Sequence, residues 1–183
     1  MEELGRKSVE DFKLADKKPL VVVMDNIRSM HNVGSVFRTA DAFLISGICL
    51  CGFTPQPPHR DIHKTALGAT DSVEWEYVED TLELVEKLKE EKIKVLAIEQ
   101  AEKSTMLQDF SIIQNQKYAV IFGNEVKGVQ QKVVSESDYC IEIPQLGTKH
   151  SLNISVSVGV VLWDLFKKFQ FYCFSYLFCP NIC

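Results

Sequence analysis

The chain has 183 residues, of which 46% are hydrophobic and 25% charged, the composition of an ordinary globular domain. No run of about 18 apolar residues is present, and the polar N-terminus lacks a secretory signal, so we expect a cytoplasmic protein with no membrane partner. The formal net charge of −5 disfavours a protein that merely coats nucleic acid through clustered lysine and arginine.

Strand-like and helix-like segments alternate along the chain. The valine-rich run Leu20–Met24 predicts a buried strand, and the apolar residues from Val33 to Leu44 recur at helical spacing behind Asn32, which can cap the first turn. Asp80, with Glu83 three positions later, predicts a second capped helix whose apolar side is Leu82, Val85 and Leu88. The other expected elements are strands at 47–52, 72–78, 95–98, 118–122 and 139–143, a long loop at 53–70, and helices at 129–135 and 152–168.

This order predicts an α/β fold with a mostly parallel sheet and helices on both faces, because several strands are apolar throughout. We expect one domain over 20–169, an N-terminal extension over 1–19 and an uncharged aromatic tail over 170–183. Cys49 and Cys51 alternate within an apolar strand and Cys140 lies in a similar setting, so these three are expected to be buried free thiols. No cysteine and histidine spacing is typical of a metal site, and no metal is expected.

Three polar, glycine-containing segments follow apolar strands, and ligands of parallel sheets bind at that edge. They cover 26–39, 123–128 and 144–155. The segment 123–128 is neither a P-loop nor a dinucleotide fingerprint, so a simple turn is an alternative. Ser151 can cap the last helix, whereas Asn153 falls on an apolar helix face where its amide needs partners. Arg38 is either an ordinary solvated arginine or part of an anion site at the start of its helix.

Taken together, the three segments resemble the motifs of the SpoU/TrmH-type 2′-O-ribose RNA methyltransferases of the SPOUT superfamily. The matching residues are Asp25–Ala40, Ile121–Gly128 and Ile143–Val156. The resemblance implies a sheet whose C-terminal part is threaded into a deep trefoil knot, S-adenosyl-L-methionine as the cofactor, and a homodimer whose active site uses residues from both chains. The substrate that it implies is RNA, with tRNA favoured over rRNA.

The resemblance also assigns roles to residues of this chain. Arg38 is the implied catalytic residue, either as a proton acceptor or as a group that holds a phosphate and stabilises a developing alkoxide; the first role is chemically awkward because arginine has a pKa above about 12. The residues expected to orient Arg38, the ribose and the cofactor are Asn32, Glu125, Ser151 and Asn153. The resemblance places the cofactor in three loops, 98–100, 122–128 and 143–152. The expected cofactor-binding residues are Ile98, Glu99, Gly123, Asn124, Gly128, Ile143, Gln145 and Leu152.

A basic segment is expected to contact the RNA backbone. It lies in the predicted loop at 59–70, and the full set of expected RNA-binding residues is Arg28, His31, Arg60, His63, Lys64 and Lys149. The alternatives are a catalytically silent RNA-binding module on the same fold, an enzyme that methylates a small molecule, and methyl transfer to a base instead of a ribose. The pair Ser151 and Asn153 favours the ribose.

Overall fold

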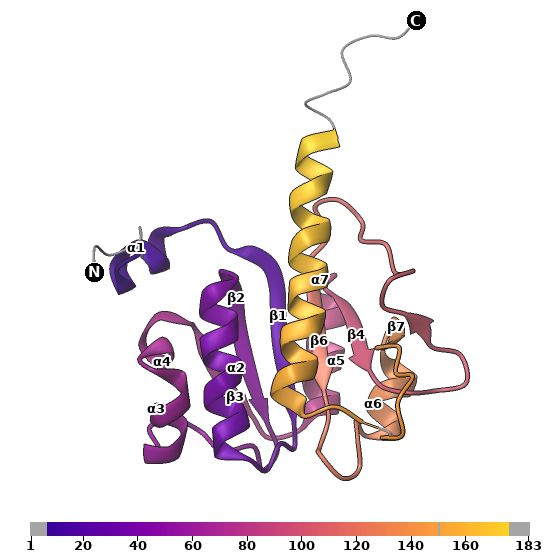
Figure 1. Ribbon diagram of the computed structural model, residues 1–183, viewed down its shortest axis with the longest axis horizontal. Helices are drawn as coiled ribbons and strands as arrows, with labels where there is room; N and C mark the ends of the chain where they lie inside the picture. The colour runs from indigo at the N-terminus through magenta and orange to yellow at the C-terminus, as the bar shows by residue number, and fades with distance from the viewer. Residues whose placement is uncertain (1–6, 150, 176–183) are drawn as a thin grey trace, which may run out of the picture.

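The computed structural model describes residues 7–149 and 151–175, which form one seven-stranded sheet in the order β3-β2-β1-β6-β4-β7-β5 (Figure 1). Every pair of neighbouring strands is parallel. The strands are β1 (Lys18–Asp25), β2 (Ile45–Cys51), β3 (Trp75–Val78), β4 (Lys94–Ile98), β5 (Thr105–Met106), β6 (Tyr118–Phe122) and β7 (Tyr139–Glu142). The helices are α1 (Val9–Leu14), α2 (Met30–Ala42), α3 (Arg60–Ala66), α4 (Ala69–Ser72), α5 (Thr81–Glu90), α6 (Gln131–Glu136) and α7 (Ile154–Ser175).

Helices cover both faces of the sheet, as the apolar strands predict. On one face α2 and α7 pack over the sheet, with Phe37, Val161 and Leu165 fully buried, and Figure 1 shows α7 rising alongside β1 and β6. On the other face α5 and α6 contribute Val85 and Val133 to a second, smaller core. All five residues of β6 are buried, because this strand lies at the centre of the sheet with both faces covered.

Two expectations for the first half of the chain are wrong. The helix α2 begins at Met30, and Ser29 is its cap, with its side chain accepting from the amide of Asn32 at 3.3 Å. The side chain of Asn32 is therefore released from capping. The segment 53–70 is not a long loop, because it contains α3 and the short α4. Ile62 and Ala66 of α3 are buried four residues apart, a helical spacing that the prolines before them obscured.

The C-terminal helix also starts later than expected. It begins at Ile154, and Asn153 caps it, with its side-chain oxygen accepting from the amide of Ser155 at 2.9 Å, so Ser151 is not the cap. The helix runs to Ser175 and crosses the predicted start of the tail, whose remainder, 176–183, lies outside the described residues. No helix in the described ranges combines the length and the apolarity needed to cross a membrane.

The N-terminal extension, for which the sequence predicted no element, carries the capped helix α1, and Phe12 on that helix is buried in the larger core. The strand β5 has two residues and was likewise not predicted. Cys49 and Cys51 are buried free thiols, as expected, whereas Cys140 is only partly buried. Burial raises the pKa of the Cys51 thiol to about 12, which leaves it protonated at neutral pH.

Candidate active site

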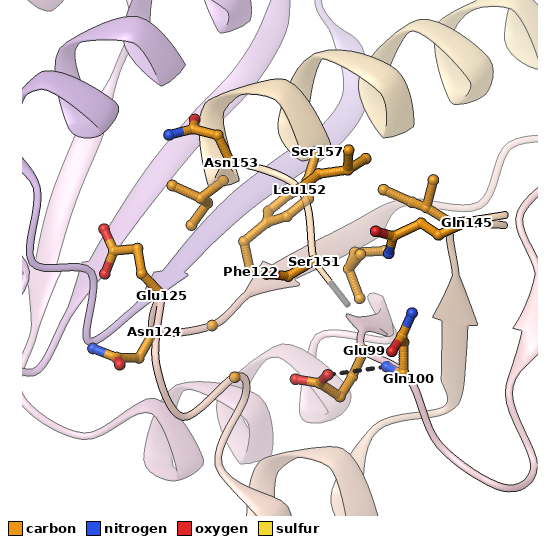
Figure 2. A pocket seen from close by; sticks show the side chains of 15 residues that line it. Glu99, Gln100, Phe122, Asn124, Glu125, Gln145, Ser151, Leu152, Asn153 and Ser157 are labelled. Atoms are coloured by element: carbon orange, nitrogen blue, oxygen red, sulfur yellow. Dashed lines mark hydrogen bonds between the residues drawn. The ribbon is translucent and has the colours of Figure 1, made fainter. Parts of the chain in front are cut away.

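A cavity of about 380 Å³ opens at the carboxyl edge of the sheet, above β4, β6 and β7 (Figure 2). Its walls come from the segments that follow these three strands and from the start of α7. All eight residues expected to bind the cofactor line it, together with Glu125, Ser151 and Asn153. Gln100 and Phe122, which belong to the loops expected to hold the cofactor, also line it, and the lining residues outside the predicted loops and predicted site residues are Ile154 and Ser157. A helical period extended from Asn153 would have indicated Ser157, which is four positions away.

The segment 123–128 is a closed turn, and its glycines are required by close contacts. The amide of Asn124 donates to Gly128 at 3.0 Å, and the amide of Gly128 donates back at 2.8 Å. A Cβ at Gly123 would lie 2.1 Å from the backbone carbon of Gly128. Gly128 has a positive φ of 69°, and its Cβ would lie 2.1 Å from the carboxylate of Glu99. The turn is thus shaped to bring the backbone against its neighbours, which a simple surface turn does not need.

Glu99 connects two walls of the cavity. One carboxylate oxygen accepts from the amide of Gln100 at 3.0 Å, and the other accepts from the amide of Val129 at 2.8 Å. The first of these bonds is drawn in Figure 2. Glu99 therefore fixes the segment after β4 to the turn after β6, while its charge remains in the cavity wall.

A chain of polar side chains joins all three motifs beside the cavity. The amide of Asn153 donates to the side-chain oxygen of Asn32 at 3.3 Å, and Asn32 in turn donates to the carboxylate of Glu125 at 3.2 Å. Glu125 also accepts from the backbone amides of Arg28 at 3.1 Å and Ser29 at 3.2 Å. Asn32 is only 9% exposed, so its amide is committed to this chain. Because Ser29 caps α2, the side chain of Asn32 is available to join Glu125 to Asn153.

The charge of Glu125 is held by these donors. Partial burial of the carboxylate acts to raise the pKa of Glu125, but hydrogen bonds from its own backbone amide, from Arg28 and from Asn32 outweigh this and keep that pKa below its usual value. Glu125 is therefore ionised at neutral pH.

A buried carboxylate, that of Asp25, supports the carboxyl edge of the sheet. Asp25, at the end of β1, is fully buried and accepts from the side chain of Thr81 at 2.6 Å and from that of Asn26 at 2.8 Å. It also accepts from the backbone and side-chain amides of Gln130 at 3.2 and 3.0 Å. Asp25 thus ties the first motif to the starts of α5 and α6, next to the turn that lines the cavity. The sequence indicated Asp25 only as the first residue of a motif.

The comparisons with known proteins assign these three segments. The profile of the SpoU rRNA Methylase family matches residues 19–163, which is most of the chain. The chain belongs to the SpoU methylase family. The Bacillus subtilis protein YacO, assigned to the TrmH family of tRNA/rRNA methyltransferases, is 28% identical over 161 residues, which cover 86% of this chain and 63% of YacO. The chain thus spans less than two thirds of the length of such curated relatives.

Solved structures confirm the predicted α/β fold of the SPOUT type. The AdoMet-bound rRNA methyltransferase of Sinorhizobium meliloti has a TM-score of 0.75 at 24% identity, over 81% of this chain and 56% of that one. The A. aeolicus TrmH/SpoU tRNA modifying enzyme has a TM-score of 0.80 at 21% identity, over 90% and 84% of the two chains. The trefoil knot stays a prediction of the family resemblance.

Arg38, the implied catalytic residue of this SpoU family chain, does not line the cavity. It is exposed on α2, seven residues after His31 and therefore on the same side of the helix, away from the buried Asn32. No hydrogen bond or ion pair of Arg38 occurs within the described residues. The nearby helix α7 exposes Val156 and Trp163, 50% and 54% accessible, seven residues apart on one side.

The expected RNA-binding residues fall into two groups. Arg60, His63 and Lys64 lie on α3, which packs against the first turn of α2, with the hydroxyl of Thr65 donating to the carbonyl of His31 at 3.0 Å. Arg28 and His31 are exposed at that same end of α2. Lys149 is exposed in the segment between β7 and α7. Lys64 forms an ion pair with Asp61 at 2.7 Å, so part of its charge is already compensated.

Proposed function

We propose that this chain transfers a methyl group from S-adenosyl-L-methionine to a ribose 2′-hydroxyl of RNA. The observation that carries the proposal is the hydrogen-bonded chain from Glu125 through Asn32 to Asn153, which brings polar groups of all three motifs to the mouth of one cavity. Membership of the SpoU methylase family and the AdoMet-bound relative support the choice of reaction and methyl donor.

The cavity suits this donor in size and charge. Small-molecule sites have volumes of about 300–1,000 Å³, and the cavity is about 380 Å³. Glu99 and Glu125 are among its lining residues, whereas no lysine or arginine is found in that lining among the described residues. A wall with two carboxylates and no cation attracts a positively charged sulfonium and amine. S-adenosyl-L-methionine supplies a methyl that is already activated as a sulfonium.

The protein residues then position the acceptor. Glu125 and Asn153, which line the cavity, present polar groups in a fixed orientation, because the buried Asn32 is hydrogen-bonded to both side chains. Such preorganised groups hold the 2′-hydroxyl in line with the methyl and lower the barrier mainly through orientation. Arg38 binds the adjacent phosphate and stabilises the developing alkoxide, a role that its permanent charge permits, whereas proton acceptance would require a neutral guanidinium. The proton of the 2′-hydroxyl is released to solvent water.

Arg38 reaches a cavity in a second copy of the chain. It does not line the cavity of its own chain, and it projects from α2 next to the exposed apolar residues of α7. A homodimer formed through Val156, Val160 and Trp163 covers these residues and carries α2 to the partner's cavity. We expect Trp163→Glu to give monomers in sedimentation velocity and to abolish methyl transfer.

Complementation tests this shared site directly. Mixed dimers of inactive Arg38→Ala and inactive Glu125→Gln contain one site with both residues intact if Arg38 acts across the interface. Activity should therefore return when the two proteins are mixed and allowed to exchange subunits. A mixture that stays inactive, although exchange is demonstrated, would show that Arg38 acts within its own chain or not at all.

The favoured acceptor is tRNA. The A. aeolicus structure, which overlaps 90% of this chain and 84% of its own, is described as a tRNA modifying enzyme. Ribosomal RNA is the acceptor in the name of the family and of the S. meliloti relative. Both acceptors therefore belong in the same assay.

The deciding experiment is transfer of labelled methyl from S-adenosyl-L-methionine to unmodified tRNA and rRNA, followed by nuclease mapping of the product. We expect a 2′-O-methylated nucleoside that disappears with Arg38→Ala. The product should persist with Lys89→Ala, which removes a lysine of α5 that pairs with Glu136. A methylated base would refute ribose specificity. Donor binding without transfer to either RNA would favour the silent RNA-binding module.

A further inference from the structure

One exposed aromatic side chain at the carboxyl edge has no role in the site described above. Phe53 follows β2 and is 62% accessible, so it contributes little to either core. Within residues 7–149 and 151–170, whose side chains the structure describes, two other aromatic residues are exposed: Trp163 belongs to the apolar side of α7, and Tyr77 lies in β3. A single exposed apolar side chain is common on a protein surface, so a role for Phe53 depends on where its backbone holds the ring.

The backbone around Phe53 is fixed on both sides. Thr54 is 2% exposed, its hydroxyl donates to the carbonyl of Met24 at 2.9 Å, and it accepts from the amide of Ile27 at 3.0 Å. The amide of Phe53 itself donates to the side chain of Asn26 at 3.2 Å. Gly52 has a φ of 61°, and a Cβ there would lie 2.1 Å from Asn26. The ring is therefore carried by an anchored segment and not by a free loop.

This segment is connected to the cavity. Asn26, which holds the amide of Phe53, accepts at its carbonyl from the side chain of Asn124 at 2.7 Å, and Asn124 lines the cavity. Phe53 is thus two hydrogen-bonded steps from the cavity wall. In the sheet, β2 and β6 are separated only by β1, a spacing of about 10 Å between strands. A nucleotide that flanks a ribose held at the cavity can reach that far.

We propose that Phe53 stacks on an unpaired nucleobase of the RNA substrate, next to the ribose that is methylated. The inference rests on the proposed function, because it assumes an RNA strand at this edge. Proteins bind single-stranded RNA by stacking bases on aromatic side chains, whichever base is present. A ring on an anchored backbone loses little conformational freedom when it stacks, so more of the contact energy appears as affinity.

The test compares three variants with the wild-type chain. Phe53→Ala removes the ring, Phe53→Trp keeps a stacking surface, and Ile113→Ala removes a comparably exposed apolar side chain, 51% accessible, before β6 at the opposite edge. The probes are unmodified tRNA and rRNA transcripts, measured for equilibrium binding and for methyl transfer. We expect Phe53→Ala to raise the Kd and the KM for RNA about 5- to 100-fold. Phe53→Trp and Ile113→Ala should stay within about twofold of the wild type, and the affinity for S-adenosyl-L-methionine should not change.

The outcomes separate this inference from the proposed function. If the wild type binds RNA but transfers no methyl, the proposed function fails, while the effect of Phe53→Ala on binding still tests stacking. If the wild type methylates RNA and Phe53→Ala binds it equally well, stacking is refuted. A Phe53→Ala protein that sediments as a monomer would also refute it, because the ring would then belong to the subunit interface. Binding of neither RNA by the wild type overturns both.

Discussion

The two edges of the sheet carry similar residues but differ in function. At the amino edge, Lys94 pairs with Asp138 at 2.6 Å, and Asp138 also accepts from the amide of Val95, so these polar groups are paired with one another. At the carboxyl edge, Asp25 and Glu125 accept from amides of loops and helix starts, and a cavity remains open between those loops. Hydrogen bonds at the carboxyl edge therefore maintain the shape of a site, whereas those at the amino edge only hold neighbouring strands together.

The largest effect is expected at Asp25. Its replacement by alanine leaves the buried hydroxyl of Thr81 and the partly buried amides of Gln130 without this acceptor, and we expect a loss of about 3 kcal/mol in the free energy of unfolding. Asp25→Asn should lose less, because one oxygen acceptor remains. Urea unfolding of both variants measures this, and equal stability of wild type and Asp25→Ala would contradict the bonding described.

Glu125→Gln should lower the rate of methyl transfer far more than it lowers the stability of the fold. The amide that replaces one carboxylate oxygen cannot accept from the backbone or from Asn32, so the polar chain loses its fixed orientation. We expect kcat/KM for methyl transfer to fall about 100-fold, comparable to the loss of one preorganised transition-state contact.

The matched control for this variant is Glu136→Gln, which breaks only the exposed pair with Lys89 at 3.4 Å near the amino edge. That variant should retain full activity. Similar losses of activity in both variants would remove the distinction between the two edges.

Much of the fold could be predicted, because strands such as β6 are apolar throughout and need no knowledge of their partners. The start of α2 could not, because Ser29 and Asn32 are equally good caps by residue type, and only the contact of Asn32 with Glu125, 93 positions away, decides between them. The same holds at α7, where Asn153 is both a cap and a partner of Asn32.

The cavity lining was predicted through family motifs, which encode contacts that local patterns do not contain. Ile154 and Ser157 were missed because they lie beyond the last predicted loop, on the first turn of α7, where the sequence shows only an apolar helix. Phe53 and Asp25 were missed as site elements for a different reason: their significance depends on hydrogen bonds between segments distant in sequence.

The smallest effect is expected from pH, and it sharpens the comparison of the edges. The pKa of Asp138, like that of Glu125, is below its ordinary value: partial burial acts to raise it, and the hydrogen bond from Lys94, the amide of Val95 and the charge of Lys94 outweigh that effect. A carboxylate with a lowered pKa in the folded state stabilises the protein at a pH above its unfolded value of about 4, and this contribution is lost as the pH falls through the folded value. The stability differences between wild type and Asp138→Asn, and between wild type and Glu125→Gln, should thus be constant from about pH 6 upward and shrink below about pH 4. Thermal unfolding across this range measures both.

Methyl transfer should distinguish the variants at pH 7, where Asp138→Asn stays active and Glu125→Gln loses most of its activity. An inactive Asp138→Asn with a stable fold would mean that the amino edge also shapes the site.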